Sequence, residues 1–267
     1  MAVVFEFTGY ALPAREVVMT LKAMIVPYIS VLHLTNEIVE SLVNQTEKII
    51  ESEIKKYRAS GPETFEIELC KEEGIFECIE HYHGLSDSDV ILDDMFLEYF
   101  PCLNRRSVFQ TIYGIYEADL LGLCRGYHKS LGGKKPDKFD GSGIVQAHNF
   151  LSKHYPELVK SKEWGAIDQL RLLRNKCVHN NGCVFERKKP IADIDALIES
   201  HPHLFHHDGI EDPEQSRYSD GSVKRLGRNI VLEKGSLNYI IDAFKAYVKL
   251  VDETHRKARI TTHQVTP

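Results

Sequence analysis

Residues 171–182 read Arg-Leu-Leu-Arg-Asn-Lys-Cys-Val-His-Asn-Asn-Gly, a stretch that combines helical periodicity with a dense set of polar side chains. Leu170, Leu173 and Cys177 recur at spacings of three and four, which predicts one apolar stripe along a helix. The run 180–182, Asn-Asn-Gly, tolerates positive φ, so we expect the helix to end there. The polar side chains therefore gather at a helix terminus, where they can leave a core without disrupting it.

The polar residues of this stretch carry groups suited to a phosphodiester. Asn175 and His179 are one helical turn apart, so we expect the amide to hydrogen-bond the imidazole and fix its tautomer. Arg174 points roughly 140° away from His179 and lies roughly 7.5 Å lower along the axis, so one helix alone does not converge the two groups. A long guanidinium can reach around the helix, and a second copy of the helix across a two-fold axis can close this gap. The planar, charged guanidinium of arginine can bind phosphate, and histidine can accept and donate a proton near neutral pH. Together the two residue types predict phosphodiester chemistry without a metal.

Arg174, Asn175 and His179 fit the pattern of an arginine, a polar residue, three other residues and a histidine. This pattern resembles the signature of HEPN domains, which lies near the end of a helix in an all-α bundle. The Asn-Asn-Gly run at 180–182 is also similar to what many of these domains carry. The resemblance covers residues 104–258. It implies either a metal-independent endoribonuclease, as in toxin–antitoxin, abortive-infection and CRISPR-associated systems, or a member that only binds ligands or partners.

The resemblance implies a complete catalytic scheme for this chain. His179 would act as general base or acid while Arg174 stabilises the charge on the phosphoryl group attacked by the ribose 2′-hydroxyl. Asn175 would orient His179. In the family an acidic residue of a neighbouring helix often supports the arginine and histidine, and Glu117 matches that location. The products would carry 2′,3′-cyclic phosphate and 5′-hydroxyl ends.

Three other interpretations of the same residues remain open. The polar stretch can be only a well-capped helix end, because cations are favourable at a helix C-terminus. The site can bind a nucleotide or an RNA end without cutting it. The chain can also be a structural dimerisation or adaptor protein whose acidic segment is its docking face.

The net charge of the chain does not distinguish these interpretations, whereas the charges close to residues 171–182 do. The formal net charge of −6 argues against a broad, nonspecific nucleic-acid coat. Cations nevertheless cluster around the stretch, with Glu186 as the opposing charge, and such an excess suits a phosphate-binding surface. The residues expected to bind RNA are Arg171, Lys176, Asn180, Arg187, Lys188 and Lys189. A selective target such as tRNA is favoured over bulk RNA, and the expected partners are this RNA, a second copy of the chain, and an antitoxin or other defence-system protein.

The cysteines indicate a reducing compartment. Six cysteines are present, no two of them form a C-x-x-C pair, and no signal peptide is recognised, so we expect reduced thiols in a cytoplasmic protein. Two clusters contain metal-ligating side chains but fit no standard zinc spacing. They are Cys70, Cys78, His81 and His83, and then His201, His203, His206 and His207. We predict no metal and no cofactor.

The remaining patterns predict a mainly α fold, a HEPN-like antiparallel helical bundle in a single domain over residues 1–267. Residues 1–13 are expected to form an N-terminal arm. The expected helices span 14–57, 104–131, 144–154, 164–178 and 236–255, with a fraying tail from Arg256. Residues 17–34 are apolar enough to suggest a membrane span, but Lys22 and Pro27 favour a buried bundle helix.

Two insertions are expected in this bundle. Residues 63–103 are strongly acidic with apolar residues interleaved, and we predict short folded helices there. Residues 184–234 contain turn signals and little helical periodicity, so we predict a loop with a small β-hairpin that pairs 184–187 with 229–232.

Overall fold

The computed structural model describes residues 28–212, 214 and 216–264, and in these residues the protein is mainly α. The helices are α2 (Tyr28–Ser60), α3 (Phe100–Leu131), α4 (Gly143–His154), α5 (Lys162–His179), α6 (Ala192–Ser200) and α7 (Ser236–Gln264). The expected arm at 1–13 and the first part of the expected first helix, 14–27, lie outside the described residues.

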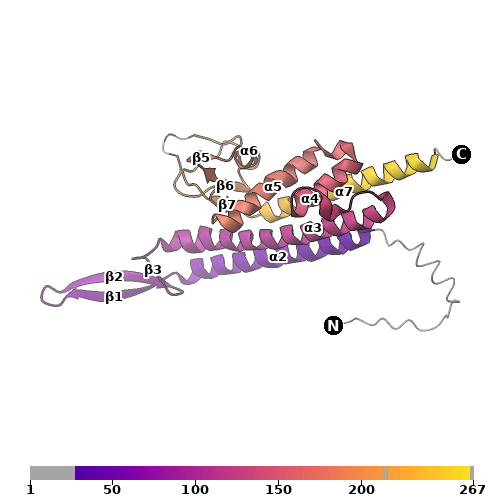
Figure 1. The fold of residues 1–267 in the computed structure, drawn as a ribbon. Helices are drawn as coiled ribbons and strands as arrows, with labels where there is room; N and C mark the ends of the chain where they lie inside the picture. The colour runs from indigo at the N-terminus through magenta and orange to yellow at the C-terminus, as the bar shows by residue number, and fades with distance from the viewer. Residues whose placement is uncertain (1–27, 213, 215, 265–267) are drawn as a thin grey trace, which may run out of the picture.

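Helices α2 and α3 run side by side along the length of the molecule, and α4, α5 and α7 lie against α3 (Figure 1). The apolar face of α3 makes this helix the centre of the core, as its sequence predicts. Phe109, Tyr113, Tyr116 and Leu120 are at most 2% exposed. The ring of Tyr116 stacks on Phe244 of α7 with 4.5 Å between centroids. The core therefore fixes α3 and α7 against each other.

The prediction of short helices in the acidic insertion is wrong over residues 63–86. This segment forms the antiparallel hairpin of β1 (Glu63–Cys70) and β2 (Ile75–Tyr82), followed by the short β3 (Leu85–Ser86). Glutamate alternates with apolar residues along β1, and a period of two is the pattern of a strand. Gly74, with φ of 60°, lies in the turn between β1 and β2. The hairpin projects beyond the ends of α2 and α3 (Figure 1).

Two helix boundaries also differ from expectation. Helix α3 begins at Phe100 rather than at Asn104, because the π-helical turn η1 (Asp94–Tyr99) runs directly into it. Asn104 therefore lies inside the helix and does not cap it. Helix α7 continues past the predicted fraying point at Arg256 as far as Gln264. The end of α3 at Gly132, with φ of 70°, is as predicted.

The second insertion forms a small lobe around α6 at one end of α5 (Figure 1). Its strands are β4 (Phe185–Glu186), β5 (Lys189–Pro190), β6 (Phe205–His207) and β7 (Ile230–Leu232). The predicted pairing of 184–187 with 229–232 holds only at its edge, where Cys183 forms a bridge with Asn229. Strand β4 instead pairs with β5, and β7 pairs with β6. The side chains of β7 are all buried, so this strand packs against the core and does not pair with β4.

Among the described helices, none combines the length and the apolar composition that a membrane span requires.

Candidate nucleic-acid site at the end of helix α5

Helix α5 begins at a side-chain cap and ends at a tight loop. The Ser161 hydroxyl accepts a hydrogen bond from the Trp164 amide at 3.2 Å. At the other end, the Asn180 and Gly182 amides both donate to the Lys176 carbonyl, at 3.0 and 2.9 Å. Gly182 has φ of 79°, a region that glycine enters without strain. The predicted helix stop at residues 180–182 is therefore confirmed.

A buried arginine of α3 holds this loop in place. Arg106 is 6% exposed, and its guanidinium donates to the Asn181 carbonyl at 3.0 Å and to the Ile230 carbonyl. A Cβ atom on Gly182 would lie 2.5 Å from Cζ of Arg106, so the loop backbone packs directly on the guanidinium. The end of α5 is thus tied to both α3 and β7.

Arg174 is seated on the central helix. Its guanidinium carbon lies 5.3 Å from the centre of the Tyr113 ring, and its Nε is buried without a hydrogen-bond partner in the described part of the chain. Burial and then the negative charge of Glu117 raise the pKa of Tyr113, while the charges of Arg171 and Arg174 oppose that rise. Arg171, Arg174 and Glu117 thus surround one phenol, although Arg171 pairs with its helix neighbour Asp168 at 2.7 Å.

The predicted contact between Glu117 and Arg174 is not found in the described structure, because Glu117 instead contacts the start of α4. One Glu117 carboxylate oxygen accepts a hydrogen bond from the Ile144 amide at 3.2 Å. A Cβ atom on Gly143 would lie 2.2 Å from the same carboxylate, so Glu117 fits closely against the first turn of α4. A carboxylate is favourable at a helix N-terminus. Glu117 therefore acts first as a cap for α4.

The predicted hydrogen bond between Asn175 and His179 is also absent from the contacts of the described residues. The Asn175 carbonyl oxygen instead accepts from Nη1 of Arg174 at 3.2 Å. His179 is exposed at the last position of α5. Asn175 therefore helps to orient the arginine rather than the histidine in a single chain.

Cations gather on the other side of the α5 terminus, beside the β4–β5 turn. Lys176 pairs with Glu186 of β4 at 2.5 Å, and this hydrogen bond lowers the pKa of Glu186. Arg187 and Lys188 form the turn with φ of 47° and 68°, and both are exposed. The exposed Lys189 follows them in β5. The contact between Lys176 and Glu186 brings this turn alongside the last turn of α5.

The site residues therefore form two groups on one helix end. His179 is three residues after Lys176, so the two lie roughly 60° apart around the helix and share the side of the cationic turn. Arg174 and Lys176 are roughly 200° apart, which agrees with the seat of Arg174 on Tyr113. The structure brings His179, Asn180 and the cationic turn together at one end, and it directs Arg174 toward α3.

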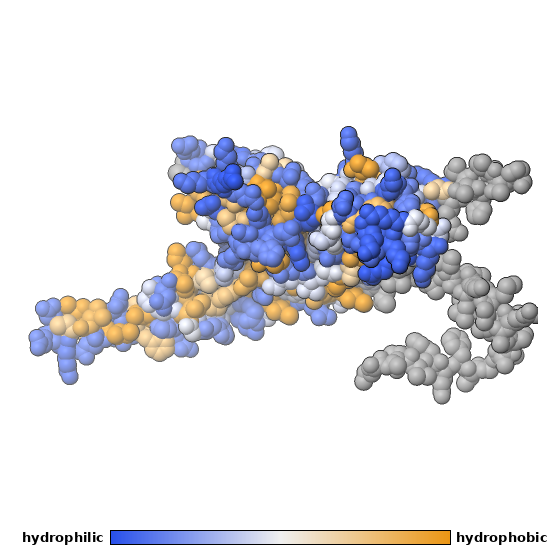
Figure 2. Space-filling model, viewed as in Figure 1, coloured by the Kyte–Doolittle hydropathy of each residue, from blue (hydrophilic) through white to orange (hydrophobic). Residues whose placement is uncertain are grey.

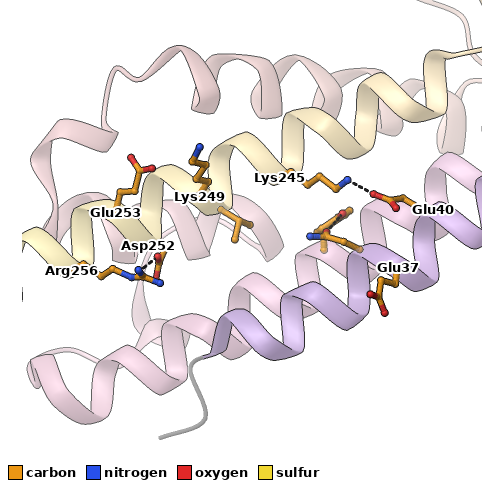
Figure 3. A pocket seen from close by; sticks show the side chains of 10 residues that line it. Glu37, Glu40, Lys245, Lys249, Asp252, Glu253 and Arg256 are labelled. Atoms are coloured by element: carbon orange, nitrogen blue, oxygen red, sulfur yellow. Dashed lines mark hydrogen bonds and ion pairs between the residues drawn. The ribbon is translucent and has the colours of Figure 1, made fainter.

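Two cavities in the described part of the fold do not contain His179 or the cationic turn. One of about 500 Å³ is formed by α2, α3 and α7, and Figure 3 shows charged side chains around it, with Lys245 paired to Glu40 and Arg256 to Asp252. The other, of about 510 Å³, lies behind the loop at Asn181 and contains four acidic side chains against two arginines. Neither composition favours a polyanion over the exposed cationic turn.

Metal-ligating side chains do not assemble in the described residues, where no group of three or more histidine, cysteine or acidic side chains has a metal-binding arrangement. In the second histidine cluster, His206 instead bonds Glu233 at 3.1 Å.

Sequence reasoning missed three residues of this region. Tyr113 lies on the apolar face of its helix, and the seat that it forms for Arg174 depends on the packing of α3 on α5. Arg106 was visible as half of an Arg-Arg pair at the start of an apolar helix, a signal for a buried charge with a fixed partner. Arg228 lies over the Phe185 ring at 5.3 Å and adds a cation beside β4. Nothing in the local sequence of Arg228 indicates this position.

No family model, curated protein or solved structure matches the chain. Its class follows from the fold and the site alone, as a mainly α protein with a cationic, histidine-bearing helix terminus.

Proposed function

We propose that this protein is a metal-independent endoribonuclease of HEPN type, built on a HEPN-like antiparallel bundle and working as a homodimer in the cytoplasm. The observation that carries the proposal is the position of His179. It is exposed at the end of α5, three residues after Lys176, and the pairing of Lys176 with Glu186 brings the turn of Arg187 and Lys188 alongside the last turn of this helix. An imidazole next to fixed cations is the combination that a phosphodiester requires.

A second subunit supplies what one chain lacks. Arg174 and His179 leave α5 in directions that differ by roughly 140°, and Arg174 lies on Tyr113, so the two groups do not converge on one phosphate within this chain. A two-fold axis beside the α5 terminus places His179 of one protomer near Arg174 of the other. The buried Nε of Arg174 lacks a hydrogen-bond partner in the described residues, so an incoming anion would supply an acceptor for it.

In this dimer the 2′-hydroxyl of RNA attacks the adjacent phosphorus and the bond to the 5′-oxygen breaks. His179 of one protomer takes the 2′ proton, and a second proton donor, the partner's His179 or water, protonates the leaving oxygen. Arg174 and Lys176 stabilise the charge on the phosphoryl oxygens. Arg187, Lys188 and Lys189 bind flanking phosphates, which favours a folded RNA such as tRNA. An antitoxin or another defence-system protein would control the activity.

A second candidate function is RNA binding without cleavage. One observation favours it: Asn175 bonds Arg174 and not His179, so within the described residues the histidine has no tautomer-fixing partner of the kind that a general base commonly has. In this case the cationic turn would hold RNA ends while no phosphodiester is broken.

The test is incubation of the purified full chain with tRNA and total RNA in EDTA, followed by analysis of the ends. His179→Ala and Arg174→Ala are each expected to reduce cleavage at least about a hundredfold, as for loss of a general base or of a charge-stabilising group. Lys138→Ala is the matched control, because Lys138 lies in a separate turn before α4 and should leave cleavage unchanged.

Cleavage to 2′,3′-cyclic phosphate that is lost in both variants supports the proposal. Retained cleavage in His179→Ala contradicts it. Binding of tRNA that weakens in Arg187→Ala/Lys188→Ala, with no cleavage by any form of the folded dimer, establishes the binding function instead.

A further inference from the structure

The β1–β2 hairpin exposes apolar side chains that an isolated chain has no reason to leave in water. Phe65 is 50% exposed and Leu69 is 60% exposed, and similar values hold for Ile67, Ile75 and Phe76. Figure 2 shows these hydrophobic residues along the projecting arm, away from the body of the molecule. A two-stranded hairpin is only marginally stable in water unless another strand or a helix covers it.

The base of the hairpin is nevertheless firmly attached. Tyr57 of α2 stacks on Phe96 of η1 with 5.1 Å between centroids, and Tyr82 at the end of β2 packs edge-on against both rings. The Tyr57 hydroxyl donates to Asp93 at 2.7 Å. The arm is thus presented in a fixed direction, while its outer part projects away from the other described elements (Figure 1).

The exposed apolar side chains of β1 lie on one face, whereas those of β2 are divided between the faces, because Phe76 is opposite Glu68 and Glu77 is opposite Ile67. Residues directly opposite each other in an antiparallel pair share a face, and Phe65 is opposite Ile79. Ile67 follows Phe65 at an interval of two along β1, so it extends the same face. The exposed Leu69 follows at the register shift between Glu68 and Cys70. The other face of β1 carries Glu66 and Glu68. Strand β1 is also an outer strand of its sheet, so one of its backbone edges is unpaired among the described strands.

The hairpin carries a strong and one-signed charge. Residues 63–82 contain seven glutamates and one lysine, so this arm alone accounts for a charge equal to the net −6 of the whole chain. Such a surface attracts a cationic partner and repels RNA. An apolar strip flanked by carboxylates selects a partner whose residues alternate between apolar and basic.

A second copy of the chain is a poor partner for β1. The two symmetric antiparallel registers that use nearly all of the strand are centred on Glu66 and on Ile67. The first places Glu66 opposite its own copy, and the second places Glu66 opposite Glu68 twice, and like charges directly opposite are destabilising. Residues 1–27 do not supply the missing charge either, because they contain two basic and two acidic residues.

We propose that the β1 edge is the docking site for a separate basic protein, which adds an extended segment of alternating lysine or arginine and apolar residues as a new strand. Its backbone pairs with β1, as in other cases of strand addition. Its apolar residues cover Phe65, Ile67 and Leu69, and its cations meet Glu66 and Glu68 on the opposite face. This inference does not depend on ribonuclease activity, since it rests on the arm alone.

The test uses the full chain and a labelled eight-residue peptide that alternates lysine and valine. Saturable binding in fluorescence anisotropy is expected, weakening at least tenfold between 50 and 300 mM salt because exposed charges are screened. Slower amide hydrogen exchange is expected in residues 63–70 when the peptide is bound. Two peptides serve as comparison: one of the same composition with its lysines and valines in separate blocks, and one that alternates glutamate and valine.

Variants separate the apolar face from the charge. Phe65→Thr/Ile67→Thr/Leu69→Thr keeps a strand-forming sequence and is expected to weaken peptide binding at least tenfold. Glu66→Gln/Glu68→Gln should weaken it too and flatten the salt dependence, and it remains informative if the threonine variant does not fold. Ile210→Thr is the matched control, since Ile210 is 75% exposed on a loop outside the arm, and it should bind as the wild type does.

Three results overturn the proposal. The first is binding of the alternating lysine peptide no tighter than that of the glutamate peptide. The second is equal binding of the block peptide, which would reduce the effect to charge. The third is a wild-type dimer in light scattering that the threonine variant converts to monomer, which would assign the apolar face to a second copy. A dimer through α5 is not affected by these substitutions, so failure here leaves the ribonuclease proposal standing.

Discussion

The helical bundle and the hairpin arm place charged and apolar side chains in opposite ways. The bundle buries charged residues, of which Arg105 and Arg106 are each only 6% exposed, and gives them partners within the chain. The arm exposes large apolar residues such as Leu69 and gives its outer part no partner in the described structure. A buried charge is tolerated only where its hydrogen bonds are satisfied, whereas an exposed apolar face is satisfied only by another surface. The bundle covers its apolar core within the chain, whereas the outer arm leaves its apolar side chains available for contact.

The largest expected effect is the loss of a buried charge partner in the bundle. Arg105 binds both carboxylate oxygens of Glu47 at 2.9 Å and donates to the Leu232 carbonyl at 3.1 Å, which ties α3 to α2 and β7. Arg105→Met leaves the Glu47 carboxylate buried and unpaired, so the free energy of unfolding should fall by about 3–5 kcal/mol. Urea denaturation followed by circular dichroism measures this change.

The double variant Arg105→Met/Glu47→Leu is the control for that prediction. Replacing both members of a buried ion pair by apolar residues is close to neutral. The double variant should therefore recover most of the lost stability. A double variant as unstable as Arg105→Met would show that the charge is not the cause.

A buried histidine gives the bundle a pH dependence that the arm does not share. His148 stacks on Trp164 with 3.6 Å between centroids and bonds the Tyr247 hydroxyl at 2.8 Å. Burial lowers the pKa of His148 from 6.5 to about 4 against the weaker opposing charge of Asp168. The unfolded chain then binds the proton more tightly, so this stability is complete above pH 6.5 and is lost as the pH falls toward 4. The loss amounts to about 3 kcal/mol.

His148→Gln isolates this contribution. Its free energy of unfolding should decline less steeply than that of the wild type between pH 6.5 and 4. Identical slopes in denaturant titrations at several pH values would contradict the assignment.

The bundle was predictable from the sequence because each of its helices carries its own periodic apolar stripe. The ends of α3, α4 and α5 were also predictable, since Gly132, Pro156 and Gly182 mark them directly. Short helices were predicted for the arm because the prediction rested on its acidic composition. The alternation of Glu66, Ile67 and Glu68 indicates a strand. Counting the period before the charge would have given the strand.

The candidate site was predictable in its residues but not in their directions. The spacing gives the 140° between Arg174 and His179, whereas the seat of Arg174 on Tyr113 depends on how α5 packs on α3. The prediction of Glu117 as a support for Arg174 failed because the start of α4, a local neighbour in space, competes for the same carboxylate. Contacts between segments far apart in the sequence decide which partner a carboxylate binds, and these contacts cannot be derived from a single sequence.

The loop at the end of α5 should respond to one added methyl group. Gly182→Ala introduces a side chain at φ of 79° and places its Cβ 2.5 Å from Arg106 Cζ. We expect a loss of about 2 kcal/mol in the free energy of unfolding. We also expect faster amide hydrogen exchange in residues 180–183. Gly126→Ala is the matched control in α3, where the added Cβ meets nothing within 4 Å. It should be neutral or stabilising, because alanine favours a helix.

The smallest expected change in the free energy of unfolding is for a substitution in the arm, and it contrasts directly with a substitution in the bundle. Leu69 is 60% exposed at the outer end of β1, so Leu69→Ala removes few contacts, and the free energy of unfolding should change by less than about 0.5 kcal/mol. Leu120→Ala, at a fully buried position of α3, should cost about 2–5 kcal/mol in the same urea titration. If the two variants were equally destabilised, the outer arm would already be covered by the chain's own residues and would need no partner. If Leu69→Ala is neutral, leucine at that position has no role in the stability of the isolated chain, which leaves contact with another molecule as its physical use.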